Sequence, residues 1–540
     1  MKRRIVKLFA LMMTLVMLLS GCQAIEMLEN LETGGMTDLV STPFDQMEYT
    51  RPDMDALQQS LEDCLAASET ETDAVALKDK LAEEFYAKYS SFYTNYNLAC
   101  IFYFKDMTDT YWETEYNFCL ENSAEVDAAY EELNDTLADC PLADALEELE
   151  YFGEGFFDAY EGESIWDDEF VALLNRESEL ESRYYQLTEE AQSVTSYSEA
   201  FFQTYGIQMA ELFVELIKVR QEQAKHAGYD SYQEFAYDFH HSRDYTPEEG
   251  ERYLEEVGEK LSPLYRRLVG TDAYEIGRVF SSEKNTYNYV QGCAQAMGGT
   301  FQEAFEYMEE DNLYDISYGP NKYNASFEVY LPDYYAPYLF VNPGMSQWDK
   351  LTFAHEFGHF CSDYASYGSS VGVDVAEIFS QGMEYLSLCY NTDGSDLAKI
   401  KMVDSLSLTV EQSAYALFEH RVYDLEGEEL TVENVQAVYE EIGNTFGFDI
   451  WNWDSRDYVL ITHFFTEPLY VISYVLSNDG AFQIYQMELA EPGKGKALLE
   501  ESLDTQTSSL MAFFEEAGLT DPFTPGRVAT IADTLEDIIY

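Results

Sequence analysis

The sequence predicts a mainly α-helical protein with one small β-sheet, and three observations support this fold class. Over residues 53–228 apolar side chains recur three and four positions apart, which is the spacing of one helix face. Two short runs at 327–331 and 338–341 are rich in β-branched and aromatic residues and are bounded by prolines, so they predict neighbouring strands. Helical spacing resumes at about residue 347 and continues towards the C-terminus.

Composition excludes some classes of partner. The chain has 540 residues, of which 46% are hydrophobic, so it is long enough to bury a large core. It carries 30 Lys and Arg against 102 Asp and Glu, a formal net charge of −72. Such a surface repels nucleic acid and anionic lipid headgroups, and we expect the folded body to bind neither. The charge could attract cationic peptides or divalent metals, or serve only to keep the protein soluble.

The first residues predict a secretory signal. Basic residues within 2–7 precede the apolar run 8–19, which is too short to span a bilayer as a mature helix. The following Leu19-Ser20-Gly21-Cys22 resembles a bacterial lipobox. That resemblance implies that residues 1–21 are removed, that Cys22 carries lipid, and that the protein lies outside the cytoplasm, anchored to a bacterial membrane. The alternative is an ordinary signal peptide followed by a chance cysteine.

The region after the signal divides into a tether and a helical part. Residues 22–52 carry Gly, Ser, Thr and Pro among scattered acids, and we expect them to link the lipid to the first packed helix. Residues 53–209 form the predicted helical N-terminal region. Further on, Thr246 followed by Pro247 and two acidic residues predicts a well-marked helix start.

The spacing of the cysteines beyond Cys22 indicates no catalytic or metal-binding role. Seven of them are present, none in a C-x-x-C pair, and the odd number leaves at least one free thiol. One or two disulfides among the first four, or buried apolar thiols throughout, are both compatible with this pattern. The seven are Cys64, Cys100, Cys119, Cys140, Cys293, Cys361 and Cys389.

The chemistry centres on His355-Glu356-Phe357-Gly358-His359. Ser346 and Asp349 resemble a capping box that would start a helix just before this motif. On that helix His355 and His359 lie one turn apart on the same face, so both imidazoles can bind one metal ion. Glu356 lies beside the metal, where its carboxylate can accept a proton from water activated by the ion.

A third protein ligand is expected, because a catalytic zinc uses three ligands and keeps an open position. Glu377 follows His359 by 18 residues and shares a helix face with Gln381 and Glu384, although that helix is otherwise apolar. The pattern therefore predicts a single Zn²⁺ bound by His355, His359 and Glu377. Two alternatives are that Glu377 is one more surface acid, and that the zinc is structural, which would require a fourth protein ligand.

These two segments, with Ala376-Glu377-Ile378-Phe379-Ser380-Gln381 as the second, resemble the oligoendopeptidase F and thimet oligopeptidase group of zinc peptidases. The resemblance covers roughly 210–525 and includes the segment 220–245. It implies a zincin-type catalytic domain over 210–540, with the small sheet beside the zinc helix and a bowl-shaped shell of helices around a deep channel. It also implies Glu377 as the third zinc ligand and short peptides as substrates.

The resemblance assigns further roles. Pro337 to Asn342 is similar to the family's substrate-binding edge strand, which implies that an extended peptide pairs with Tyr338, Leu339, Phe340 and Val341. The segment from His463 to Tyr474 is similar to the family's C-terminal segment of one His and several Tyr. It implies that His463, Tyr470 or Tyr474 donates a hydrogen bond to the oxyanion, with a preference for Tyr470 among the tyrosines.

Two acidic residues are candidates for supporting the ligands. Asp374 and Glu384 could accept hydrogen bonds from the ring N–H groups of the zinc histidines. Asp374 could instead cap the helix that carries Glu377.

The predicted function is zinc-dependent hydrolysis of short peptides outside the cytoplasm, in one step and without a covalent intermediate. The alternative from another class is a lipoprotein that captures peptides without cutting them. Such a binder needs neither Glu356 nor a metal, so the intact H-E-x-x-H motif and Glu377 count against it.

Overall fold

A computed structural model describes residues 41–539, except 150–151, 153–154, 161–164, 192–193, 195–197, 269–274, 276, 369–370, 391–396, 452, 506 and 508. The predicted signal (1–21), Cys22 and most of the predicted tether therefore lie outside the described residues. The described part is mainly helical with one small sheet, as the sequence predicts.

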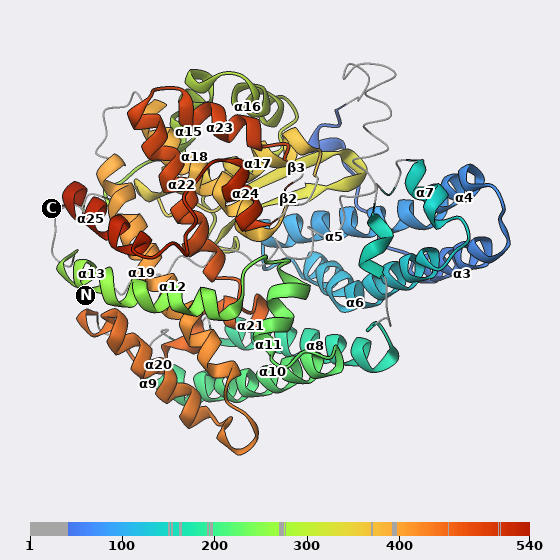
Figure 1. The fold of residues 1–540 in the computed structure, drawn as a ribbon, viewed down its shortest axis with the longest axis horizontal. Coiled ribbons are helices and arrows are strands. Elements are labelled where there is room, and N and C mark those ends of the chain that lie inside the picture. Colours follow the sequence, from blue (N-terminus) through green and yellow to red (C-terminus); the bar gives the residue numbers. More distant parts are fainter. Residues whose placement is uncertain are drawn as a thin grey trace.

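The helices of the N-terminal half spread along the long axis: the first ones, in blue, lie at one end of the molecule, and the last ones, in green, lie towards the other (Figure 1). They are α3 (Met54–Thr70), α4 (Ala74–Leu81), α5 (Ala87–Lys105), α6 (Thr110–Ala138), α7 (Ala143–Glu148), α8 (Asp168–Ala191), α9 (Glu199–Phe201), α10 (Ile207–His226), α11 (Tyr232–Phe235), α12 (Pro247–Lys260) and α13 (Ser262–Leu268). Asp53 caps α3, since its carboxylate accepts from the N–H of Ala56. Thr246 caps α12 in a complete capping box with Glu249, which confirms the predicted start.

The C-terminal half contains the sheet and the longest buried helices. Its elements are α15 (Glu283–Met297), α16 (Thr300–Glu310), β1 (Tyr314–Ile316), β2 (Ser326–Leu331), β3 (Ala336–Val341), α17 (Trp348–Ser366), α18 (Val373–Tyr390), α19 (Leu397–Tyr423), α20 (Val432–Phe446), α21 (Thr462–Thr466), α22 (Ile472–Ala490), α23 (Lys494–Ser502), α24 (Leu510–Glu516) and α25 (Arg527–Ile539). Three π-helical turns, at Ala82–Tyr86, Phe202–Gly206 and Ala236–His240, adjoin α5, α10 and α11.

The predicted tether is too long at its C-terminal end. Phe44 and Met47 are buried in the core, and the Phe44 ring centroid lies 4.3 Å from that of Tyr338 in β3. The backbone N–H of Phe44 also donates to the carbonyl of Asp311 at 2.8 Å. Two apolar side chains in a polar segment are enough to fix it to the body, so from Phe44 onward the chain belongs to the packed fold.

The sheet has the strand order β1-β3-β2, and this corrects the prediction for residues 338–341. β3 pairs with β1 in parallel and with β2 in antiparallel fashion, with Leu339 opposite both Tyr314 and Glu328. Tyr338, Leu339, Phe340 and Val341 therefore lie in the central strand, whose two edges are already paired, and an extended peptide has no room to add there. The three-residue β1 is too short to show a pattern in the sequence, and without it β3 looks like an edge.

Helix α17, which carries the H-E-x-x-H motif, packs on the sheet and on α18, and α18 packs in turn on α22. Gly358 permits the close approach of α17 to α18. A Cβ atom at this position would lie 2.6 Å from both the carbonyl oxygen of Phe379 and the Cα of Ser380. At the start of α17, Asp349 accepts from the backbone N–H of Ser346 at 2.8 Å, which is one of the two bonds of the predicted capping box.

The seven cysteines of the described chain are all free, and six of them are buried. Of the two possibilities that the sequence leaves open, the structure thus has thiols rather than disulfides. None of the helices among the described residues combines the length and the apolar character needed to cross a membrane.

Candidate metal and catalytic site

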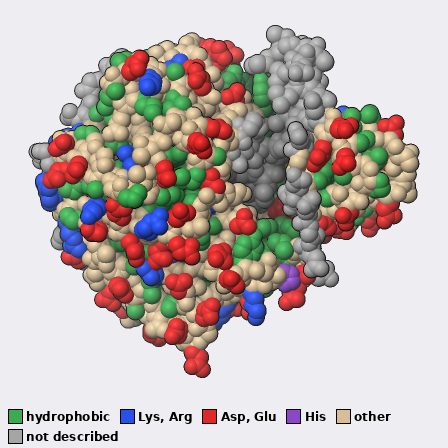
Figure 2. Space-filling view, viewed as in Figure 1, with side chains coloured by type: hydrophobic (Ala, Val, Ile, Leu, Met, Phe, Trp, Pro, Cys, Tyr) green, Lys and Arg blue, Asp and Glu red, His purple; other side chains and the backbone are tan. Residues whose placement is uncertain are grey.

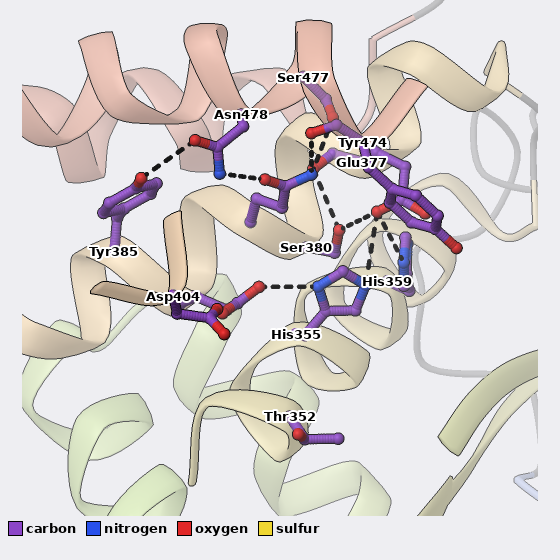
Figure 3. A network of polar contacts seen from close by, with 12 residues as sticks. Thr352, His355, His359, Glu377, Ser380, Tyr385, Asp404, Tyr474, Ser477 and Asn478 are labelled. Atoms are coloured by element: carbon purple, nitrogen blue, oxygen red, sulfur yellow. Dashed lines mark hydrogen bonds and ion pairs between the residues drawn. The ribbon is translucent and has the colours of Figure 1, made fainter. Parts of the chain in front are cut away.

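His355, His359 and Glu377 come together as the sequence predicts, two from α17 and one from α18 (Figure 3). Their ligand atoms all lie within 4.8 Å of one another, and all three side chains are buried. The Oε2 atom of Glu377 is 3.4 Å from Nε2 of His355 and 4.0 Å from Nε2 of His359. Two imidazole nitrogens and a carboxylate oxygen, converging from two helices, are a donor set that suits zinc.

Glu384 orients His355 from behind. The Nδ1–H of His355 donates to Oε1 of Glu384 at 2.9 Å, which turns Nε2 towards Glu377. The other oxygen of Glu384 accepts from Nζ of Lys401 at 2.9 Å, and the Lys401 side chain is fully buried. Although burial acts in the opposite direction, the charges of Lys401 and His355 lower the pKa of Glu384 to about 2, so it is a fixed anion. Lys401 gave no signal in the sequence, because a single Lys in a helical pattern usually lies on the surface.

The electrostatics of the cluster suit a cation. Burial opposes a charge on His355, yet Glu377, Glu384 and Glu356 together raise the pKa of His355 to about 9. Three carboxylates around one imidazole thus favour positive charge at the point where the three ligand atoms converge, which supports the fit of a divalent metal ion.

Glu356 is buried and, among the described residues, has one oxygen without a hydrogen-bond partner, which are features of a catalytic base. Its side chain is 2% exposed, and its Oε1 atom has no hydrogen-bond partner within the described structure. Burial, reinforced by the charges of Glu377 and Glu384, raises the pKa of Glu356 to about 8. A buried acceptor without a partner is costly to a fold and is a common feature of reactive sites.

The segment from α21 to the start of α22 brings His463, Tyr470 and Tyr474 to the same cluster. The hydroxyl of Tyr470 donates to Oε1 of Glu377 at 2.8 Å, while Ser380 donates to Oε2 at 2.9 Å. The Tyr474 hydroxyl lies 3.4 Å from Nε2 of His463. Burial lowers the pKa of His463 to about 4, so this imidazole is neutral. The Tyr470 proton is therefore engaged by a candidate metal ligand, unlike the arrangement expected for an oxyanion donor.

Within the described structure, Asp374 bonds to groups other than the histidines of the cluster. Its Oδ2 accepts from the Tyr245 hydroxyl at 3.0 Å and lies 3.5 Å from Nε of Arg243. The carboxylate thus ties α18 to the segment before α12, instead of supporting a metal ligand. Tyr245 and Arg243 are distant from Asp374 in sequence, so no local sequence pattern predicts this contact.

Comparisons with known proteins agree with this arrangement at the level of the fold. Residues 44–164 match the family model described as Peptidase M3 N-terminal domain. This is a part of the chain in which the sequence showed only helical character. No curated protein matches the chain in sequence.

Several solved structures share the fold over almost the whole chain. An X-ray structure named as an oligoendopeptidase F superposes with a TM-score of 0.78 and 21% identity, over 92% of this chain and 99% of that chain. PZ peptidase A with an inhibitor superposes equally well, with a TM-score of 0.78 and 19% identity over the same shares. Oligoendopeptidase F from Enterococcus faecium gives 0.58 and 15% over 90% and 97%. The chain thus has the fold of the oligoendopeptidase structures and contains a segment similar to the Peptidase M3 N-terminal domain.

Proposed function

We propose that this protein is a zinc-dependent peptidase that hydrolyses short peptides. The observation that carries the proposal is the convergence of two imidazoles and one carboxylate beside the buried Glu356, whose Oε1 has no hydrogen-bond partner within the described structure. The similarity of the fold to peptidase structures supports the same reaction class.

His355, His359 and Glu377 would hold the ion. When bound, such an ion acts as a Lewis acid on the peptide carbonyl and makes water acidic enough to attack near neutral pH. Glu384 and Lys401 hold His355 in the required tautomer, and Tyr470 and Ser380 orient the two oxygens of Glu377. The ligands are therefore fixed before substrate arrives, which is the arrangement that electrostatic catalysis requires.

Glu356 moves the proton. It accepts a proton from the attacking water as the new C–O bond forms, and it delivers that proton to the amine nitrogen as the C–N bond breaks. Burial favours the protonated carboxyl of Glu356 between the two events, whereas the charge of a bound ion would favour the carboxylate that first accepts the proton. No group of the protein becomes covalently bound to the peptide.

We assign stabilisation of the oxyanion to Tyr474 and His463. Tyr470 is already bonded to Glu377, so it acts on the ligand, and the neighbouring Tyr474 is better placed to donate to substrate. The neutral state of His463 allows its ring N–H to donate without adding a second full charge to the site.

We also propose that the protein is exported and anchored through lipid on Cys22. The support is the order of basic residues, apolar run and Leu19-Ser20-Gly21-Cys22 at the start of the chain. The Cys22→Ser variant should fail to incorporate a labelled fatty acid in a bacterial host, whereas labelling of this variant would exclude the anchor.

The activity is tested with purified full-length protein and a mixed pool of short peptides, read by mass spectrometry before and after removal of metal by a chelator. We expect internal bonds to be cut, the cutting to stop on chelation, and zinc to restore it. Cutting that persists in the chelated protein would exclude the metal mechanism. A zinc-loaded protein that binds peptides and leaves them intact would instead favour peptide capture.

A further inference from the structure

We propose that Arg220 is a positioning residue that holds the segment carrying His463, Tyr470 and Tyr474 in its working geometry. This inference rests on the proposed function, because it assigns Arg220 a part in that reaction. Arg220 lies on α10, far from the metal cluster in sequence, and it contacts neither the ligands nor Glu356 through any bond of the described structure.

The segment cannot hold this shape by itself. Helix α21 has only five residues, which is far below the length at which an isolated helix is stable in water. Leu469, just before Tyr470, has a φ of +59°, in the left-handed region that is unfavourable for a non-glycine residue. Contacts from other elements must therefore fix the segment.

Arg220 provides the contact next to the histidine. Its side chain is 0% exposed, and its guanidinium donates from Nη1 to the carbonyl of Phe464 at 2.8 Å and from Nη2 to that of Phe465 at 2.6 Å. These carbonyls belong to the two residues that directly follow His463. The same guanidinium donates from Nε to Glu177 of α8 and from Nη1 to the Tyr423 hydroxyl of α19 at 3.1 Å. One planar group with five N–H donors thus joins α8, α10 and α19 to α21.

The rest of the segment is held by buried polar side chains in the same way. The N–H of Leu469 donates to Oε1 of Glu419 at 2.8 Å, and Nε2 of His241 lies 2.9 Å from the carbonyl oxygen of Pro468. Beyond the turn, Gln381 of α18 donates to the carbonyl of Tyr474 at 3.1 Å. Arg220 is the member of this set that bonds to the carbonyls of both residues after His463, so its loss should release the histidine first.

A purely structural alternative is that Arg220 only neutralises Glu177 and Glu181, which lie 2.5 Å and 3.8 Å from it. The two roles predict different results for Arg220→Lys. Lysine keeps the positive charge beside the carboxylates, but its single ammonium cannot reproduce the fork that grips two successive carbonyls. If Arg220 only neutralises the two carboxylates, Arg220→Lys should keep the kcat of wild type. If Arg220 positions the segment, Arg220→Lys should lose activity.

The test compares purified, zinc-loaded full-length wild type with Arg220→Lys, using one peptide that wild type cuts. We expect kcat to fall by on the order of 100-fold, with KM and bound zinc unchanged. Hydrogen exchange read by mass spectrometry should accelerate in residues 462–474 and stay as in wild type in α17. Adding Arg220→Lys to His463→Ala should lower kcat less than Arg220→Lys does in wild type, because the two changes share the contribution of His463.

Tyr423→Phe is the matched control. It removes one bond of Arg220 and leaves both carbonyl bonds, so kcat and exchange in 462–474 should stay close to wild type. If Arg220→Lys does not fold, Arg220→Met can be combined with Glu177→Gln. The double variant removes the two carbonyl bonds without leaving Glu177 charged and unpaired, and we expect the same fall in kcat and the same faster exchange in 462–474.

Wild-type exchange in 462–474 of the Arg220 variants would overturn the proposal, as would a normal kcat in Arg220→Lys. Should wild type cut no peptide, the proposed function fails, and the exchange experiment still decides whether Arg220 holds the segment.

Discussion

The two oxygens of Glu377 have different partners, which accounts for the different contacts of the neighbouring Tyr470 and Tyr474. Oε2 faces both histidines and accepts from Ser380, while Oε1 accepts from Tyr470. A ligand carboxylate restrained on both oxygens can rotate little, so the affinity for metal depends on the groups behind it. Tyr470 and Tyr474 lie with ring centroids 5.2 Å apart, yet the first contacts the ligand and the second contacts His463.

Removing one hydroxyl at a time should separate these two roles. Tyr470→Phe should weaken zinc binding by about 10- to 100-fold, measured by competition with a chelating dye, because Glu377 loses a restraint. Tyr474→Phe should leave zinc affinity unchanged and lower kcat by about 10²- to 10³-fold, because an oxyanion donor is lost. The reverse pattern, in which Tyr474→Phe loses zinc and Tyr470→Phe keeps it, would contradict the assignment.

Helices α17 and α18 form the frame of the site, and their separation sets the distance between the histidines and Glu377. The two helices approach closely at Gly358, directly between the two histidines of the motif. A glycine in the middle of a helix is unfavourable for the helix itself, so its presence here is explained by packing. The sequence shows this glycine, but only the structure shows the Phe379 carbonyl that a side chain would meet.

Gly358→Ala should therefore destabilise the protein by about 1–3 kcal/mol in urea unfolding, because the added methyl group pushes α18 away. Zinc affinity should fall as well, since Glu377 moves with α18. Gly292→Ala is the control: a methyl group added to this exposed glycine of α15 would meet no atom within 4 Å, so alanine should be neutral or stabilising by up to about 1 kcal/mol. Equal stability of the two variants would show that the close approach does not constrain the helices.

At the scale of the whole molecule, a net charge of −72 coexists with carboxyl groups buried in the core. Acidic side chains are spread over the visible face and few basic ones lie between them (Figure 2). Burial raises the pKa of the fully buried Glu419 to about 8, and partial burial raises those of Asp127 and Glu131 to about 6 and about 7. These carboxyls are more protonated in the folded than in the unfolded state. Both the surface repulsion and the buried groups should make alkaline conditions unfavourable for the fold.

Glu419→Gln tests the buried contribution. An unfolded Glu titrates near 4.3, so a folded pKa of about 8 means that stability is fully present below that ordinary range and is lost as the pH rises towards 8. Between pH 6 and pH 9 the free energy of unfolding of wild type should fall more than that of Glu419→Gln, which stays neutral. The exposed Glu433→Gln should behave like wild type. Parallel curves for wild type and Glu419→Gln would contradict the shifted pKa.

The sequence predicts the features of the fold and the site that depend on residues close together in the chain. Caps at Asp53 and Thr246 locate helix starts, and the i, i+4 spacing brings His355 and His359 together, because both depend on residues within a turn of each other. The central place of β3 depends on β1, and the bonds of Lys401 and Arg220 depend on how distant helices pack. Such contacts leave no periodic pattern in the sequence.

Bound zinc and peptide hydrolysis, measured in the same preparations of wild type and Glu356→Gln, separate metal binding from catalysis. Glutamine keeps the size of the side chain and cannot accept the proton, so we expect one zinc per chain in both proteins and a loss of kcat of about 10²- to 10⁴-fold in the variant. A variant that retains zinc and cuts peptides at the rate of wild type would show that Glu356 is not the base of a metallopeptidase.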